Sequence, residues 1–163
     1  MKLKITLSLF VVMLVATVIS FAGGKADFSG TWKLEKDKSF SNPAGLEQTL
    51  VITQKSDQIT LDTDLKTTRG GAQKLTEVYS LDGKDTDFAP PQPPNAKGKR
   101  KASWLPNGQG IMIEDVVSVE GKVISQTTRK WTLSADGKTL TVDYFIDVQQ
   151  GAYEAKRVFT KVM

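Results

Sequence analysis

The sequence predicts an all-β domain, an antiparallel up-and-down meander of about eight to ten strands that closes into a barrel. Three observations predict this fold. Segments rich in Thr, Val, Ile and Tyr alternate apolar and polar residues with a period near two, as half-buried strands do. Turn dipeptides separate these segments, at Asp82-Gly83, Asn107-Gly108, Glu120-Gly121 and Asp136-Gly137. No window carries the apolar stripe of a helix of ten or more residues.

The expected strands follow one another along the chain with short turns between them. They are Phe28–Leu34, Leu46–Gln54, Gln58–Lys66, Lys74–Leu81, Arg100–Leu105, Ile111–Val119, Val123–Leu133, Thr139–Val148 and Ala152–Val162. A Lys55-Ser56-Asp57 turn joins the second strand to the third, and Gly70-Gly71 precedes the fourth. One connection, Asp85–Lys99, is long and rich in proline, so we expect a solvent-exposed loop there.

The order of the strands predicts how the sheet closes. Successive strands joined by short turns are antiparallel neighbours. A meander of this kind leaves two exposed edges unless its first and last strands pair. Closure of eight to ten strands produces a barrel. The competing arrangement is a two-sheet sandwich.

The N-terminus has the pattern of a signal peptide. Met1–Lys4 is basic, the segment Ile5–Phe21 is apolar and uncharged, and small residues at Ser20 and Ala22 allow cleavage after residue 22. We therefore expect a signal peptide at 1–22, a single domain at 23–163, and a secreted or periplasmic protein. A second possible cleavage site follows Ala26, and the alternative is an uncleaved N-terminal anchor helix.

The amino-acid composition excludes several kinds of catalytic and metal-binding site. The chain has no His and no Cys, which excludes disulfides, thiol nucleophiles, zinc–thiolate sites and Ser-His-Asp catalysis. We expect no metal and no cofactor, and an enzyme would have to depend on carboxylates, Tyr or Lys. Removal of Lys2 and Lys4 with the signal lowers the net charge from +4 to +2. We expect no nucleic-acid partner and a monomer.

The two ends of the chain carry a possible barrel closure. Gly30-Thr-Trp32 lies in the first strand, and Arg157 lies in the last. This arrangement resembles the lipocalin and fatty-acid-binding superfamily, the calycins, whose first strand carries a Gly-x-Trp motif. The resemblance implies a lipocalin-like barrel in which Arg157 stacks on the ring of Trp32 and closes one end.

A second resemblance covers more of the chain. Its segments are Asp27–Leu34, Tyr79–Lys84, Trp131–Val142 and Arg157–Lys161. They look like segments of a group of small secreted bacterial proteins without an assigned activity. This resemblance implies the compartment and the fold, and it implies nothing about function.

Four residues are candidates for ligand binding: Arg129, Trp131, Trp104 and Tyr79. Regular alternation would place Arg129 and Trp131 on one face with Val123 and Leu133. An inward Arg suits an acidic ligand head group, as in the fatty-acid binders that the chain resembles. A single bulge would turn Arg129 to the solvent, and the Trp residues could equally be core.

Two carboxylates fall on otherwise apolar strand faces. Glu77 shares parity with Leu75 and Tyr79, and Asp115 lies between Ile113 and Val117. Inside a barrel the two could perform acid–base chemistry with pKa values raised by burial. They could equally pair with Arg129 or Arg157, or face water. No catalytic residue is assigned on this pattern.

Lys97, Lys99, Arg100 and Lys101 form the one basic cluster. Outside the cytoplasm its anionic partners would be lipid head groups or polysaccharides, an envelope component. The alternative is a run of charges that protects an exposed sheet edge from aggregation.

The function that the sequence favours is non-covalent binding of a small apolar or amphipathic ligand inside the barrel. The alternative is an envelope-associated structural or interaction module with a solid core. The step from barrel to ligand is an analogy, because a fold does not fix a function.

Overall fold

A computed structural model describes residues 24–162, so the predicted signal peptide lies outside the described residues. The described chain contains ten strands and one short 3-10 helix, which confirms the all-β prediction. The strands are β1 (Gly30–Leu34), β2 (Glu47–Lys55), β3 (Gln58–Thr67), β4 (Gly71–Ser80), β5 (Asp82–Phe88), β6 (Lys97–Trp104), β7 (Gly110–Val119), β8 (Lys122–Leu133), β9 (Thr139–Val148) and β10 (Gly151–Val162). The 3-10 helix η1 (Lys36–Lys38) follows β1. No helix within the described range is long and apolar enough to cross a membrane.

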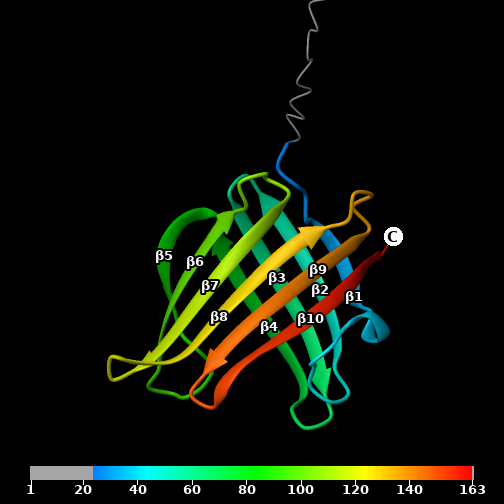
Figure 1. Ribbon diagram of the computed structural model, residues 1–163. Helices are drawn as coiled ribbons and strands as arrows, with labels where there is room; N and C mark the ends of the chain where they lie inside the picture. The colour runs from blue at the N-terminus through cyan, green and yellow to red at the C-terminus, as the bar shows by residue number, and fades with distance from the viewer. Residues whose placement is uncertain (1–23, 163) are drawn as a thin grey trace, which may run out of the picture.

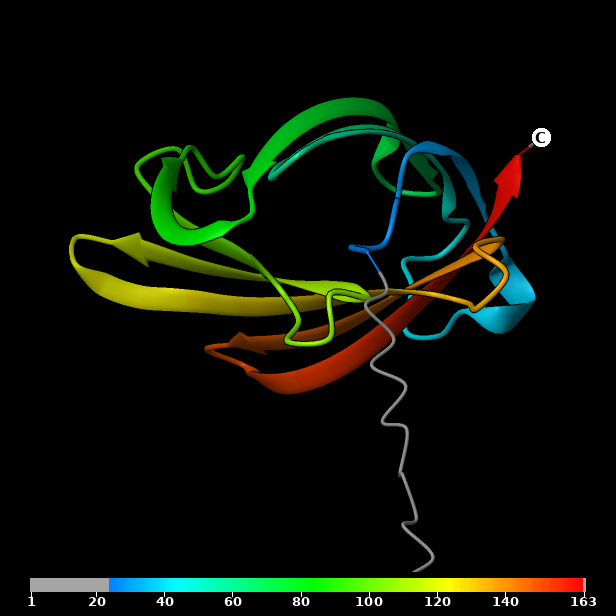
Figure 2. The same ribbon diagram turned by 90° about the horizontal axis from the view of Figure 1, so that it is seen from above.

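All ten strands belong to one antiparallel sheet in the order β4-β3-β2-β1-β10-β9-β8-β7-β6-β5. The first and last strands pair, with Trp32 opposite Lys161 and Leu34 opposite Phe159. The sheet therefore curls into a nearly closed barrel, and the ribbon encircles one interior (Figures 1 and 2). The predicted closure is confirmed, and the sandwich alternative is wrong.

The expected loop at Asp85–Lys99 is shorter than the sequence suggested. Residues 85–88 complete β5, and β6 already begins at Lys97, so the connection is confined to residues 89–96. The pairing of β5 with β6 sets Asp85 opposite Lys101 and Asp87 opposite Lys99. Opposite charges on facing strands stabilise a ladder that has no apolar alternation on one of its strands.

The dipeptide Glu120-Gly121 shows why the sequence marks its turns so clearly. It joins β7 to β8, and both residues have positive φ, +50° and +78°. Two successive residues of positive φ make the type of two-residue turn whose twist matches that of the flanking strands. The turn dipeptide therefore fixes this hairpin locally, before any long-range contact forms.

The largest buried rings of the apolar core lie near the barrel end at which β1 begins and β10 ends. Trp32, Phe28 and Phe159 are fully buried there, and Trp131 is almost so. The Phe28 and Trp131 rings meet edge to face with centroids 6.1 Å apart, a favourable aromatic arrangement. Buried side chains therefore close this end of the barrel.

The segment before β1 covers the closed end. The Ala26 N–H donates to the Gly108 carbonyl at 2.9 Å, and Gln54 Nε2 donates to the Ala26 carbonyl at 2.9 Å. The Lys25 ammonium pairs with Asp57 and lies 5.1 Å from the centre of the Trp104 ring. Residues 24–26 are therefore part of the folded domain.

A chain that starts at Asp27 is expected to be less stable than one that starts at Gly24. It loses three hydrogen bonds of the covering segment, which are together worth about 1.5–4.5 kcal/mol, and the exposed Lys25–Asp57 ion pair. Trp104 also loses its cover, so its fluorescence should shift to longer wavelength. Urea unfolding of the two chains, followed by tryptophan emission, measures both effects. Equal midpoints and equal spectra would show that the segment contributes nothing.

Candidate functional site

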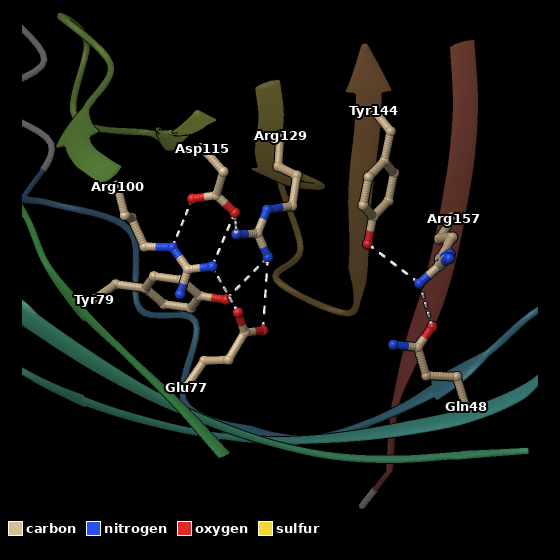
Figure 3. A network of polar contacts seen from close by, with 8 residues as sticks. All are labelled: Gln48, Glu77, Tyr79, Arg100, Asp115, Arg129, Tyr144 and Arg157. Carbon is tan, nitrogen blue, oxygen red and sulfur yellow. Dashed lines mark hydrogen bonds and ion pairs between the residues drawn. The ribbon is translucent and has the colours of Figure 1, made fainter. Parts of the chain in front are cut away.

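A layer of polar side chains crosses the barrel interior between the closed end and the open end. It comprises Gln48, Glu77, Tyr79, Arg100, Asp115, Arg129, Tyr144 and Arg157 (Figure 3). These residues occupy inward positions. Glu77 lies on the same face of β4 as the buried Tyr79, and Arg157 lies on the same face of β10 as the buried Ala155 and Phe159. Toward the open end the inward side chains are accessible to solvent, with Leu75 43% and Tyr153 52% exposed.

Two arginines and two carboxylates form one half of the layer. Arg100 binds Asp115 through two parallel bonds, Nε to Oδ1 at 2.6 Å and Nη2 to Oδ2 at 2.8 Å. Arg129 Nη2 reaches the same Asp115 Oδ2 at 2.6 Å. Glu77 adds contacts of 2.9 Å to Arg100 and 3.6 Å to Arg129. The charges of this ionic cluster of four therefore cancel.

Aromatic rings enclose the ionic cluster. The Arg100 guanidinium contacts the rings of Tyr79 and Phe88, 4.9 Å and 4.4 Å from their centres. The Tyr79 hydroxyl accepts a hydrogen bond from Arg129 Nη1 at 3.0 Å. Burial raises the pKa of the Tyr79 phenol, so it stays protonated at neutral pH. Burial disfavours the charge of Arg129, but Tyr79, Asp115 and Glu77 outweigh it and raise the pKa of the guanidinium.

The two inward carboxylates thus pair with arginines, as one of the alternatives allowed: Arg129 is one predicted partner, whereas the other is Arg100 and not Arg157. Their oxygens accept hydrogen bonds from guanidinium groups, so both carboxyl groups are engaged in ion pairs. No cluster of three His, Cys, Asp or Glu residues suited to a metal ion exists between residues 24 and 162.

Arg157 forms the other half of the layer, and its partners are neutral. Its Nη1 donates to Gln48 Oε1 at 3.0 Å and to the Tyr144 hydroxyl at 3.3 Å, and its Nε donates to Asn42 Oδ1 at 3.2 Å. Its guanidinium also lies 4.8 Å from the centre of the Tyr144 ring. Arg157 is therefore an inward cation whose polar contacts with the described residues leave its charge uncompensated (Figure 3).

The prediction that Arg157 stacks on the ring of Trp32 is wrong, because another cation occupies that place. The cation over the Trp32 ring is Lys161, 5.2 Å from the ring centre, because register sets Lys161 directly opposite Trp32. Gly30 makes room for it: a Cβ at this position would lie 2.6 Å from Lys161 Cε. Gly30, Trp32 and Lys161 close the barrel end, and Arg157 lies nearer to its middle.

The other predicted ligand residues lie close to one another. Tyr79 and Trp131 are about 1% and 2% exposed, and their rings meet edge to face with centroids 6.0 Å apart. Trp104 is partly buried beside Phe28, with centroids 6.2 Å apart. Together with the inward Arg129 they form the boundary between the closed core and the polar layer. The indole N–H groups of Trp104 and Trp131 and the Arg129 Nε have no hydrogen-bond partner among the described residues.

The basic cluster on β6 is smaller than predicted. Arg100 points inward and is 7% exposed, so it does not belong to a surface patch. Strand alternation separates it from its neighbours Lys99 and Lys101. Lys99 pairs with Asp87 at 2.8 Å, a contact that raises the pKa of the Lys99 ammonium, and Lys101 lies opposite Asp85 and Glu114. Acidic neighbours thus offset much of the remaining charge.

Sequence reasoning missed Gln48, Asn42 and Tyr144, which hold Arg157, as well as Phe88 and Lys161. Gln48 is the clearest signal in retrospect. It occupies an inward position of β2 in line with Leu50 and Ile52, and it is only 8% exposed. A buried amide implies a polar partner inside the barrel.

Comparison with known proteins identifies the fold. No protein-family model and no curated protein matches the sequence. Among solved structures, the chain is similar to zebrafish ileal bile acid-binding protein complexed with cholic acid, with 17% identity and a TM-score of 0.53. The match covers 84% of this chain and 100% of that chain. At this identity the similarity concerns the fold alone, and the fold is a calycin-like barrel of ten antiparallel strands.

Proposed function

We propose that the protein binds, without covalent chemistry, a small amphipathic molecule that carries a single negative charge. The proposal rests on Arg157, an inward guanidinium whose polar partners among residues 24–162 are all neutral oxygens. We further propose, on the signal-like N-terminus, that it does so outside the cytoplasm.

The charge of the polar layer supports a monoanionic head group. Arg100 and Arg129 are balanced by Glu77 and Asp115, and Arg157 adds one positive charge. A carboxylate or sulfonate that replaces neutral acceptors at Arg157 gains charge-assisted hydrogen bonds, which are about twice as strong as neutral ones. A single anion would bring the layer to neutrality.

The open end supports an apolar tail on the same ligand. Leu75 and Tyr153 occupy inward positions there, and both are about half exposed. Covering apolar surface of this kind contributes roughly 25 cal/mol per Å². The similar barrel from zebrafish holds a small amphipathic molecule, cholic acid, which agrees with this division into head and tail.

The proposal predicts how a series of ligands with one tail and different heads will bind. Laurate is expected to bind more tightly than dodecanol and dodecyltrimethylammonium, because only laurate supplies an anion to Arg157. Arg157→Gln should weaken laurate about 10- to 100-fold, the value of a hydrogen bond to a charged group. Isothermal titration calorimetry measures each affinity.

Lys156→Gln is the matched control for this experiment. Lys156 is the neighbouring cation on β10, but it pairs with Asp143 at 3.5 Å instead of with the polar layer. It should leave the affinity for laurate unchanged. Equal binding of dodecanol and laurate, or equal losses in the two variants, would refute a head-group role for Arg157. Absence of binding across the whole series would refute the ligand function itself.

A further inference from the structure

The barrel has one seam at which neighbouring strands are not hydrogen-bonded. β4 and β5 are the two ends of the strand order, whereas every other neighbouring pair forms a ladder. Only a single residue, Leu81, separates the two strands in sequence. The seam therefore depends on side chains rather than on backbone hydrogen bonds.

The side chains that close the seam converge on Arg100. From β4, Glu77 reaches Arg100 at 2.9 Å, and the Tyr79 ring lies against the guanidinium. From β5, the Phe88 ring also lies against the guanidinium, with its centre 4.4 Å away. Asp115 of β7 accepts two hydrogen bonds from Arg100 and so fixes the position of the guanidinium. Arg100 thus links both edges of the seam to the wall of the barrel.

Beyond this link, β4 has little support. Every residue of β4 before Glu77 is exposed, on the inward as well as on the outward side. Its backbone pairs with β3 alone. A strand with one hydrogen-bonded neighbour and few buried contacts belongs to the least stable part of a fold.

A hollow lies against the β5 side of the link. Its volume is about 740 Å³, and Phe88, Gly98, Lys97 and Ser118 are among its lining residues. The Phe88 ring lies directly on Gly98, where a Cβ would be 2.4 Å from the ring. Phe88 is thus the cover between this hollow and the Arg100 guanidinium.

We propose that the seam between β4 and β5 is a side entrance to the polar layer, held shut by Arg100 together with Glu77 and Phe88. Opening requires that Glu77 leave its two arginines, that Tyr79 leave Arg100 and Arg129, and that β4 swing with β3. No hydrogen-bonded ladder joins β4 to β5, so none between them is broken. That a ligand uses this entrance rests on the proposed ligand function. The opening of the seam itself can be measured without a ligand.

Hydrogen exchange followed by mass spectrometry tests the opening. Glu77→Gln keeps the shape of the side chain and removes its charge, so exchange in peptides from β4 and β5 should become at least about tenfold faster. Exchange in β9 and β10 serves as the internal reference for global stability. Asp64→Asn is the matched control, because it breaks an ion pair of β4, Lys74–Asp64 at 3.2 Å, that does not cross the seam.

Stopped-flow binding of the fluorescent monoanion 1-anilinonaphthalene-8-sulfonate tests the entrance. Phe88→Ala removes the cover without changing the charge, so association and dissociation should both become faster, with a smaller change in Kd. Glu77→Gln should also speed association, and Asp64→Asn should not.

The outcomes separate the two proposals. If exchange in β4 and β5 does not respond to Glu77→Gln, or responds equally to Asp64→Asn, the latch is wrong. If the fluorophore binds but its rates are the same in Phe88→Ala, the ligand passes through the open end and the side entrance is wrong. If no variant binds it or laurate, the ligand function fails, and the exchange data still decide whether the seam opens.

Discussion

Arg100→Met is expected to lower the free energy of unfolding by about 3–5 kcal/mol, the typical cost of removing one partner from a buried ion pair. Arg100 is 7% exposed and holds Asp115, whose side chain is 12% exposed. Methionine fills much of the space between the Tyr79 and Phe88 rings, so the loss reports charge rather than a cavity. Two carboxylates then face Arg129 alone. Urea unfolding at neutral pH, followed by circular dichroism, measures the difference.

A second substitution separates charge balance from packing. Arg100→Met combined with Asp115→Leu removes one charge of each sign and leaves Arg129 with Glu77. This double variant should regain much of the lost stability, because buried charges are costly mainly when they are unpaired. Lys36→Met breaks an exposed ion pair with Glu47 and should cost less than about 1 kcal/mol. If Arg100→Met also costs less than about 1 kcal/mol, the ionic cluster does not hold the seam.

Local sequence signals were enough to predict most strands and the closure of the barrel. Dipeptides such as Glu120-Gly121 specify a turn from within, through their positive φ angles. Short turns make most strands hydrogen-bonded neighbours of the next without knowledge of long-range contacts. The exception is β4 and β5, which a single residue, Leu81, separates and which form no ladder. The pairing of β1 with β10 then joins the two ends of the meander, and only the seam between β4 and β5 is left without a ladder.

β5 was not predicted as a strand because its pairing with β6, and not its own sequence pattern, stabilises it. Asp82–Phe88 carries three Asp residues and almost no apolar alternation, so by itself it resembles a loop. Its Asp85 and Asp87 face Lys101 and Lys99, which lie more than ten residues further along the chain. Such cross-strand pairing is visible only once the register is known.

The position of Arg129 depended on where a bulge falls. The register between β7 and β8 shifts at Val117 and Ser118, so Ser118 pairs with Val123 whereas Val117 pairs with Ser125. The shift lies between Val123 and Arg129. Val123 therefore leaves the shared face and is 50% exposed, while Arg129 keeps the inward side with Trp131. One irregular pair, which no local pattern marks, decides which of these residues reaches the polar layer.

The choice between Arg157 and Lys161 depended on register in the same way. Both occupy inward positions of β10, four residues apart, and both are cations. Alternation gives the face of a strand but not the height of a residue in the barrel. The pairing of Trp32 with Lys161 sets that height, and it leaves Arg157 free to meet Gln48, Asn42 and Tyr144.

Trp32→Ala is the second large effect that we expect, a loss of about 3–5 kcal/mol in the free energy of unfolding. The ring is fully buried at the closed end, and its Nε1 donates to the Phe28 carbonyl at 2.9 Å. Alanine leaves a cavity bordered by the solid core and removes the surface on which Lys161 rests. Thermal and urea unfolding measure the loss.

Trp32→Phe tests which part of the side chain matters. It keeps most of the ring volume and gives up the bond to Phe28, so it should cost about 1–2 kcal/mol. Lys161→Met keeps the stem over Gly30 and removes the ammonium, and it should cost about 1 kcal/mol or less. The order Ala, Phe, then Met would establish that the closed end is held mainly by packing of the indole ring. A loss below about 1 kcal/mol for Trp32→Ala would contradict the burial of Trp32, and a larger loss for Lys161→Met than for Trp32→Ala would mean that the cation holds the end instead.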